Sequence, residues 1–415
     1  MLRNGGGMKE FMKLKKVGFV IPWYHKDIPG GAEMELRGTV NHLHESGLDV
    51  EIITTCVKDF NSDWTENYFK EGVEEIDGVT TRRFKVRKGN LEAFHKVNYK
   101  IMNNLPISIE EEDIFLKEMV NSPDMYQYIE EKKDNYLAFV FIPYMFGTTY
   151  FGMQACLEKA VLIPCLHDEN YAYFRRFKDL FSKINSIIFH AQPEMDLANR
   201  LYDLSKVRTT ALGEGVETDF EYNEERFREK YNVRVPYIIY AGRKDHAKNV
   251  DTLITYFKEY KSRNANGMKL ILIGGGSMDI PSEIKDDVMD LGFLPIQDKY
   301  DACAGSVLLC QPSKNESFSI VIMESWLCER PVLVHKRCNV TQYFAEASKA
   351  GLYFDNYLEF EGCINYIYNN AEVANQMGQN GRNFVLSNFK WEVIVERFVD
   401  FFKKVREDEE ENSNN

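Results

Sequence analysis

The segment from Glu316 to Glu324 carries two carboxylates eight residues apart, shortly after an apolar run at Val307–Cys310. That run is typical of a buried strand, and the residues after it favour a helix that begins near Ser317 or Phe318. Backbone N–H groups in the first turn of a helix have no partner within the helix, so they suit an anion such as phosphate. We expect these donors at Phe318, Ser319 and Ile320.

The spacing of the two glutamates also carries a geometric prediction. Eight helical residues turn through about 800°, so Glu316 and Glu324 are expected on roughly one side of the helix. One carboxylate could then reach a sugar ring and the other a ribose. The alternative is that Glu316 only caps the helix and that Glu324 is a surface charge.

A second cluster, Gly242 to Asn249, follows the apolar run Tyr237–Ala241. Arg243 offers a planar fork of donors, and Lys248 offers a mobile point charge. On a loop that opens a helix, the two could clamp a diphosphate and neutralise the charge that develops on it as a leaving group. The alternative is a solvated loop with ordinary surface cations.

Two further clusters lie in the first half of the chain. Gly30 and Gly31 follow the run Val17–Pro22 and precede a helix, whose N-terminus would favour a phosphate or sugar hydroxyls. His167, which also follows a strand-like run, can hydrogen-bond to a sugar hydroxyl while Asp168 orients its ring. The alternatives are a plain glycine turn and a structural histidine satisfied by its neighbours.

Several familiar motifs are absent from the sequence. The triplet Gly274-Gly275-Gly276 follows a strand, but the third glycine of the dinucleotide fingerprint G-x-G-x-x-G falls on Asp279. There is no D-x-D triplet for a metal-bound sugar nucleotide and no Walker-type phosphate loop. The eight cysteines form no C-x-x-C pair, which predicts buried free thiols in a reducing cytoplasm.

The elements that must position these residues follow a regular rhythm. Short apolar runs alternate with amphipathic segments of helical length, which predicts an α/β protein with parallel, doubly wound sheets. The rhythm restarts after a charged connection at 218–235. We therefore expect domains over 1–217 and 218–390, then a terminal helix in 391–415 that can cross back to the first domain and ends in a disordered acidic tail. The predicted strands are Val17–Pro22, Val50–Thr54, Leu137–Ile142, Ala160–Cys165, Ser186–Phe189, Val207–Ala211, Tyr237–Ala241, Lys269–Ile273, Val307–Cys310 and Val332–Val334.

The stretch 59–135 departs from this rhythm. Thr80–Val86 alternates like an edge strand, and Glu110–Asp113 is a run of four acidic residues. A solvated helical excursion is the favoured interpretation. An insertion that meets an acceptor is the alternative.

Composition limits the class of partner and the location. A net charge of −13 argues against nucleic-acid binding, and 44% apolar residues allow a sizeable core. Met1–Lys16 shows no apolar leader, and Tyr136–Phe151 is too short to span a bilayer, so we expect a cytoplasmic protein. Tyr171–Asn185 interleaves aromatic residues with cations and could dock on the anionic inner face of the plasma membrane. The alternative is that its apolar stripe packs on its own domain.

The order of these clusters resembles one family. Gly30-Gly31-Ala32-Glu33, then His167-Asp168, then Arg243-x-x-x-x-Lys248, then Glu316-x7-Glu324 is similar to the retaining glycosyltransferases of family 4. The resemblance implies the B-type fold, two Rossmann-like domains facing across a cleft, and transfer of a sugar from a nucleotide-sugar donor to a glycan or lipid-linked acceptor. Cell-surface polysaccharide or glycolipid synthesis would be the setting. A sugar-nucleotide epimerase, a phosphorylase and a non-catalytic binding module are the alternatives.

The resemblance also implies roles for matching residues. Arg243 and Lys248 would hold the donor diphosphate, Glu316 the donor sugar and Glu324 the ribose, while His167 would lie at the reaction centre. The other donor-site residues would be Gly30, Gly31, Gly242, Phe293, Leu294, Phe318, Ser319 and Ile320. The nucleotide-diphosphate sugar is a co-substrate, and neither a metal nor a further cofactor is implied.

Two departures from the family pattern stand out. Ser317 and Ser319 occupy positions where the family more often has glycine, so their side chains would narrow the space around the phosphate. Glu214 stands before Gly215-Val216 where the family usually has asparagine, and the sequence assigns that carboxylate no role.

Overall fold

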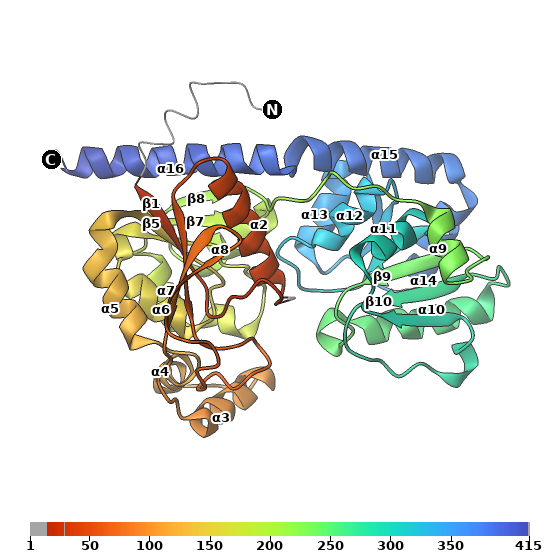
Figure 1. Ribbon diagram of the computed structural model, residues 1–415. Helices are drawn as coiled ribbons and strands as arrows, with labels where there is room; N and C mark the ends of the chain where they lie inside the picture. Colours follow the sequence, from red (N-terminus) through yellow and green to blue (C-terminus); the bar gives the residue numbers. More distant parts are fainter. Residues whose placement is uncertain (1–14, 29, 414–415) are drawn as a thin grey trace. The chain divides into compact units, whose positions relative to one another are not determined.

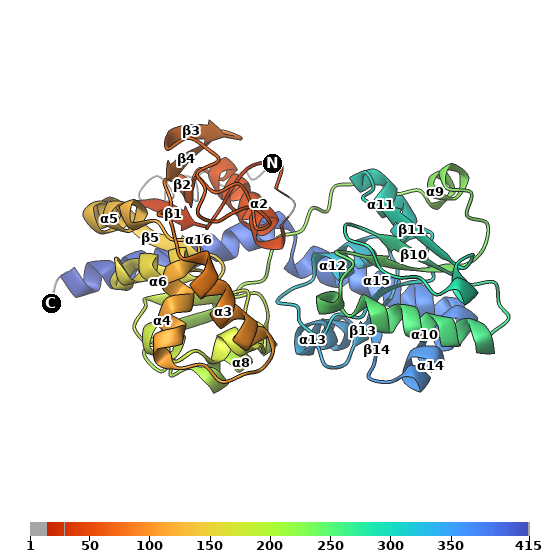
Figure 2. The same ribbon diagram turned by 90° about the horizontal axis from the view of Figure 1, so that it is seen from below.

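The computed structural model describes residues 15–28 and 30–413, which form two compact units. Unit 1 comprises the chain up to Gly215 together with the segment from Trp391 onward, and unit 2 comprises Val216–Lys390. Each is an α/β unit built on one mainly parallel sheet (Figures 1 and 2). The predicted lack of a leader in Met1–Lys16 falls mostly on residues outside the described part.

The sheet of unit 1 has eight strands in the order β3-β4-β2-β1-β5-β6-β7-β8. All neighbours pair in parallel except β3 and β4. The segment Thr80–Val86, predicted as an edge strand, forms most of β4, which lies inside the sheet between β2 and β3. The edge strand is β3, which was not predicted because its sequence is mainly polar. The strands are β1 (Lys16–Val20), β2 (Val50–Thr55), β3 (Gly72–Ile76), β4 (Val79–Phe84), β5 (Tyr136–Phe141), β6 (Ala160–Leu162), β7 (Ser186–Phe189) and β8 (Arg208–Ala211).

The helices from 91 to 132 are part of the core of unit 1, so the prediction of a solvated excursion is wrong. Phe94 of α3 and Phe115 of α4 are buried in the same cluster as the β5 residues Phe139 and Phe141. The unit's α-helices are α2 (Gly31–Glu45), α3 (Leu91–Met102), α4 (Ile109–Glu118), α5 (Pro123–Lys132), α6 (Gly147–Gln154), α7 (Arg175–Phe181), α8 (Gln192–Leu201) and α16 (Trp391–Ser413).

The acidic run at the start of α4 has structural partners. Ser108 and Glu111 form a capping box, in which each side chain satisfies the other residue's backbone N–H. Glu112 accepts the backbone N–H groups of Arg175 and Arg176 at 3.1 and 3.0 Å, which caps the N-terminus of α7. These carboxylates therefore cap the N-termini of α4 and α7 and are not simply solvated.

The apolar stripe that suggested membrane docking is buried. Phe174, Phe177, Phe181 and Ile184 are each at most 3% exposed and belong to the core of unit 1. The alternative, packing of this stripe on its own domain, is therefore the one observed. Among the described residues, none of the helices combines the length and apolar character needed to cross a bilayer.

The sheet of unit 2 has six parallel strands in the order β11-β10-β9-β12-β13-β14. The strands are β9 (Tyr237–Ala241), β10 (Lys269–Ile273), β11 (Val288–Gly292), β12 (Leu308–Gln311), β13 (Val332–His335) and β14 (Gly351–Phe354). β11 and β14, both less buried and of mixed sequence, were not predicted.

Helices connect the strands of unit 2. They are α9 (Glu224–Lys230), α10 (Val250–Arg263), α11 (Ile296–Ala304), α12 (Ile320–Leu327), α13 (Asn339–Ser348), α14 (Tyr357–Asn369) and α15 (Ala371–Asn388). α9 lies within the charged stretch expected to be only a connection, and its Phe227 is buried against Tyr237. Arg226 and Lys230 also pair with Asp301 and Asp298 of α11, so this charged helix is held by both apolar and ionic contacts.

The acidic C-terminal segment is helical, so the expectation of a disordered tail is wrong as far as Ser413. Helix α16 packs against α2 and β5 of unit 1 (Figure 1). Glu409 accepts from Lys15 at 3.0 Å and from Lys159 at 3.1 Å, and Asp408 pairs with Arg208. Cations that are distant in sequence meet these acidic groups only after folding.

Candidate functional site

The predicted clusters of unit 2 meet at the carboxyl ends of β9 and β12. The strand order reverses between these two neighbours, and open α/β sheets bind ligands at such a switch point. Lys248, which follows β9, donates to Glu316, which follows β12, over 2.7 Å. The amide of Asn249 donates to the carbonyl of Pro312 at 3.0 Å, so a second bond holds the two loops together.

The loop after β9 is organised by Asp245. One carboxylate oxygen accepts the backbone N–H of Lys248 at 2.9 Å, and the other accepts from Nε of Arg243. The Arg243 side chain is 61% exposed, and no acceptor within the described residues is recorded for its terminal amines. The two terminal amines of the Arg243 guanidinium and the Lys248 ammonium, which is paired with Glu316, therefore belong to the same loop, as a clamp on an anion requires.

Glycines allow the loops after β9 and β10 to touch. The backbone of Gly274 is at φ +123°, and a Cβ there would lie 2.1 Å from the carbonyl oxygen of Gly242. Gly276 is at φ +83°, and its Cβ would lie 2.4 Å from the carbonyl oxygen of Lys244. The triplet Gly274–Gly276 does not match the dinucleotide fingerprint. Its glycines instead let the loop after β10 pack closely against the loop that carries Arg243.

Helix α12 begins at Ile320, later than predicted. Ser319 is its N-cap and adopts a left-handed conformation, φ 77°, which stops the helix from extending backward. The N–H of Ile322 bonds to the carbonyl of Ser319 at 3.2 Å. Of the expected donors Phe318, Ser319 and Ile320, only Ile320 lies inside the first turn, where Val321 joins it. The Phe318 ring is buried against Phe344 and Phe389.

The two glutamates bind different cations. Glu316 pairs with Lys248, whereas Glu324 is 6% exposed and accepts from Lys299 of α11 at 2.6 Å. Residues 316–319 are not helical, so the argument that eight helical residues place both carboxylates on one side does not hold. The two alternatives are also wrong, because each carboxylate is paired with a cation. Glu316 is not simply a helix cap, and Glu324 is not simply a surface charge.

Phe293 lies in the turn after β11 and is 75% exposed. A Cβ on Gly275 would lie 2.7 Å from its ring, so the ring rests on the glycine loop. Leu294 beside it is half-buried. An exposed aromatic face supported from below can stack on a base.

Four site residues of unit 2 were missed by sequence reasoning. They are Lys244, Asp245, Asn249 and Lys299. Lys244 is buried and pairs with Asp290, and Lys299 holds Glu324. Asp245 gave a signal, since an aspartate three residues before the Lys248 N–H is a capping pattern. The others gave none, because their partners lie in other segments of the chain.

In unit 1, Gly30 is the N-cap of α2 and lies under the Glu33 carboxylate, where a Cβ would come within 1.8 Å of Oε2. Nothing lies within 4 Å of a Cβ on Gly31. Glu33 accepts from the Trp23 indole, and burial raises the pKa of this carboxyl above its ordinary value. The Gly-Gly turn is therefore a helix start that admits a buried glutamate.

His167 lies beside Glu169, with Nδ1 at 3.8 Å from Oε1. Asp168 accepts from the hydroxyl of Tyr173 at 2.7 Å. Glu169 is itself held by the buried Tyr144 hydroxyl at 2.9 Å. The histidine thus has a carboxylate neighbour in Glu169, and its orientation by Asp168 stays a prediction.

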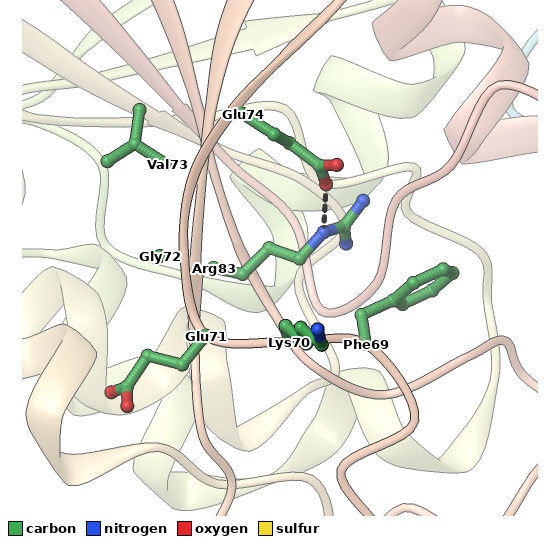
Figure 3. A pocket seen from close by; sticks show the side chains of 7 residues that line it. All are labelled: Phe69, Lys70, Glu71, Gly72, Val73, Glu74 and Arg83. Atoms are coloured by element: carbon green, nitrogen blue, oxygen red, sulfur yellow. Dashed lines mark hydrogen bonds and ion pairs between the residues drawn. The ribbon is translucent and has the colours of Figure 1, made fainter.

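A cavity of about 150 Å³ lies on the β3–β4 hairpin of unit 1. Figure 3 shows the ion pair between Arg83 and Glu74 that forms one wall. None of the predicted site residues lines it. The lining residues are Phe69, Lys70, Glu71, Gly72, Val73, Glu74 and Arg83.

Residues 221–384 match the family model described as glycosyl transferases group 1. This segment lies inside unit 2 and contains both loops of the switch point. A search of curated protein sequences finds no significant relative.

Solved structures resemble the chain over nearly its whole length. Sucrose-phosphate synthase from Thermosynechococcus elongatus has a TM-score of 0.68 at 17% identity, over 94% of this chain and 99% of that chain. HepE of Anabaena in complex with UDP-glucose has a TM-score of 0.67 at 14% identity, over 94% and 100%. A TarM mutant of S. aureus, in complex with fondaparinux, alpha-GlcNAc-glycerol and UDP, has a TM-score of 0.62 at 13% identity, over 94% and 100%.

These comparisons agree with the fold described above. The chain has the architecture of the B-type glycosyltransferases, in which two α/β units each carry a parallel sheet. At these identities the structural likeness concerns the fold, while the sequence match concerns unit 2.

Proposed function

We propose that the protein is a retaining glycosyltransferase that moves a sugar from a nucleotide-diphosphate sugar to a glycan or lipid-linked acceptor. The proposal includes a cytoplasmic location, a role in cell-surface polysaccharide or glycolipid synthesis, and no metal on the donor diphosphate. The observation that carries it is the Lys248–Glu316 pair at the β9/β12 switch point, within the segment that matches glycosyl transferases group 1.

The charges around the switch point suit a diphosphate leaving group. Negative charge develops on the diphosphate as its bond to the sugar breaks, and preorganised cations stabilise that charge. The cations here are the Arg243 guanidinium and the Lys248 ammonium. The N-terminus of α12 adds a partial positive charge. In this proposal the departing phosphate also takes the acceptor's proton on the same face of the sugar, which retains configuration.

Glu316 has two successive partners in this scheme. Without a donor, its carboxylate is held by Lys248. A bound diphosphate competes for the same ammonium, and its higher charge favours that exchange. Glu316 is then released to accept hydrogen bonds from sugar hydroxyls. Glu324, held by Lys299, would bind the ribose, and Phe293 would stack on the base.

Lys248→Ala tests the proposal. Loss of this cation should lower kcat/KM by about 100-fold or more, as removal of one transition-state donor does in other enzymes. Lys258→Ala is the matched control, because it removes an ion pair of 2.6 Å to Glu283 from the surface of the same unit. Steady-state transfer assays compare the two. Normal turnover by Lys248→Ala with the correct donor would refute the site.

The donor is identified first, from a thermal-shift panel of UDP, GDP, ADP and CMP sugars. A ligand stabilises the folded state by RT ln(1 + [L]/Kd), so the true donor gives the largest shift. Incubation of that donor without acceptor separates the alternatives. An epimerase would convert it to a new sugar nucleotide, whereas a transferase leaves it intact or hydrolyses it slowly. Inorganic phosphate as the acceptor tests for a phosphorylase.

A further inference from the structure

A group of buried and partly buried ionisable side chains in unit 1 has no part in the function proposed above. Glu35 is on α2, Cys165 follows β6, His190 follows β7, and Glu214 follows β8. Nε2 of His190 lies 2.5 Å from Oε1 of Glu35, and Sγ of Cys165 lies 3.7 Å from Oε2 of the same carboxylate. Helix α2 and the segments after β6 and β7, which are distant in sequence, thus bring Glu35, Cys165 and His190 to one place.

The donor set is that of a transition-metal site. One ligand atom each from Glu35, Cys165 and His190 lie within 4.8 Å of one another. A thiolate with an imidazole and a carboxylate favours zinc-class ions over magnesium or calcium, which prefer oxygen ligands alone. Cys165 is held at φ 51°, a left-handed conformation that a non-glycine residue adopts at some cost.

Glu214 supplies a second, independent observation. It is only 9% exposed, and within the described residues no hydrogen bond or ion pair is recorded for its carboxylate. It follows β8, which pairs with β7 so that Ala211 lies beside Phe189, the residue before His190. A carboxylate with so little contact with solvent is stabilised by a nearby cation. This is the residue that stands where the resembled family usually has asparagine.

Glu194 completes the arrangement around the histidine. Its carboxylate accepts the backbone N–H groups of Leu166 at 2.6 Å and of His190 at 2.7 Å. The same Oε2 lies 3.6 Å from Nδ1 of the His190 ring, so a carboxylate stands on the side opposite Glu35. Metal-binding histidines commonly have such a carboxylate behind the ring, where it fixes the orientation of the ligand nitrogen.

The charge balance also favours a cation. Three buried carboxylates, Glu35, Glu194 and Glu214, face one imidazole and one thiol. A divalent cation among them would offset the negative charge that the carboxylates bring into this poorly solvated place.

We propose that Glu35, Cys165, His190 and Glu214 form a four-ligand site for a zinc-class divalent ion that joins α2 to the ends of β6, β7 and β8. Bonds of about 2.1 Å at tetrahedral angles place ligand nitrogen and oxygen about 3.4 Å apart. The Glu35–His190 contact therefore opens by about 1 Å when the ion enters. The ion stabilises unit 1 and is distinct from the donor diphosphate, so the site stands or falls independently of the proposed transferase activity.

The experiment uses full-length protein stripped with a chelator and titrated with Co²⁺ and Zn²⁺. Co²⁺ should bind with about one ion per chain and show a thiolate-to-metal charge-transfer band together with the intense visible bands of a four-coordinate ion. Zn²⁺ should displace it and raise Tm, whereas Mg²⁺ should do neither. Zn²⁺ binding followed in weakly buffered solution should also release protons.

Variants decide whether these four residues are the ligands. Cys165→Ser should abolish the charge-transfer band, and Glu214→Gln should weaken Co²⁺ binding at least tenfold while it preserves shape. Cys156→Ser is the matched control, because that thiol is also buried in unit 1 but lies outside the group. Circular dichroism verifies that each variant is folded. A stripped wild-type protein that binds no Co²⁺, or a thiolate band that survives Cys165→Ser, would overturn the proposal.

Discussion

At the scale of single residues, the proposed donor site depends on side chains that hold other side chains. Asp245 fixes both cations of the β9 loop, one through Nε of Arg243 and one through the backbone N–H of Lys248. Lys299 holds Glu324 in the same way. The charged residues at this end of the sheet are therefore paired with one another. A charged ligand that binds there must replace one member of such a pair.

Asp245→Ala tests whether this aspartate organises the loop or merely competes for Arg243. If it organises the loop, donor affinity should fall by about tenfold, because two charge-assisted bonds are lost. Asp245→Asn should recover part of the loss, since its amide oxygen can still accept the Lys248 N–H. Isothermal titration with the donor measures both. A rise in affinity would show that the carboxylate only competes with the ligand.

Ser319 marks the start of α12 with a left-handed backbone. A non-glycine residue there costs about 1 kcal/mol, and more if it is β-branched. Ser319→Gly should therefore leave the free energy of unfolding of unit 2 unchanged or raise it by up to about 1 kcal/mol, whereas Ser319→Val should lower it by about 2 kcal/mol. Urea denaturation gives both values. Equal effects of the two substitutions would contradict the role of backbone strain.

At the scale of elements, the site is a meeting of loops at one edge of a sheet. The loop after β9 bonds to the loop after β10 through the Lys244 N–H and the Gly275 carbonyl, at 2.7 Å. It bonds to the loop after β12 through Asn249 and Lys248. The position of Arg243 is therefore set by its neighbours on both sides and not by its own loop alone.

Gly276→Ala should disturb this support. Its φ of +83° and the Lys244 carbonyl 2.4 Å from a new Cβ combine backbone strain with a clash, so we expect a cost of about 3 kcal/mol. Gly267→Ala is the control, because φ is +66° there but a Cβ meets open space, and about 1 kcal/mol is expected. Donor affinity should fall only for Gly276→Ala. Thermal unfolding and donor titration of both variants check this.

At the scale of the whole molecule, the last helix belongs to the first unit. The Trp391 ring fills the space beside Gly38 and Gly215, where a Cβ would lie 2.5 and 2.1 Å from it. Further along α16, Ile394, Phe398 and Phe402 are buried. The core of unit 1 is therefore incomplete until the C-terminal helix α16 has been synthesised and has packed on it.

A chain that ends at Lys390 should show this dependence. Each buried aromatic or large aliphatic side chain contributes about 2 kcal/mol, so the calorimetric transition of unit 1 should move to much lower temperature while that of unit 2 stays. A chain that ends at Arg406 is the control, since it loses only partly exposed ion pairs worth about 1 kcal/mol or less each. Unchanged calorimetric transitions in both chains would contradict the assignment of α16 to unit 1.

Local pattern determined much of this protein. Continuous apolar runs identified the buried strands, because a strand covered on both faces leaves no polar positions. The two α/β units and the switch-point residues Arg243, Lys248 and Glu316 followed from those runs, since strand ends define where a parallel sheet binds ligands. The weak points were segments with few apolar residues, such as β3, β11 and α9, whose identity comes from neighbours.

Tertiary structure decided which charged groups are partners. The sequence could not show that Lys299 holds Glu324 or that Lys159 meets Glu409, because such contacts join segments far apart in the chain. It also could not show that Glu35, Cys165 and His190 meet, since each is unremarkable in its own segment. Helix and strand periods act over a few residues, whereas the electrostatic surroundings of a buried group are set by whatever the completed fold places beside it.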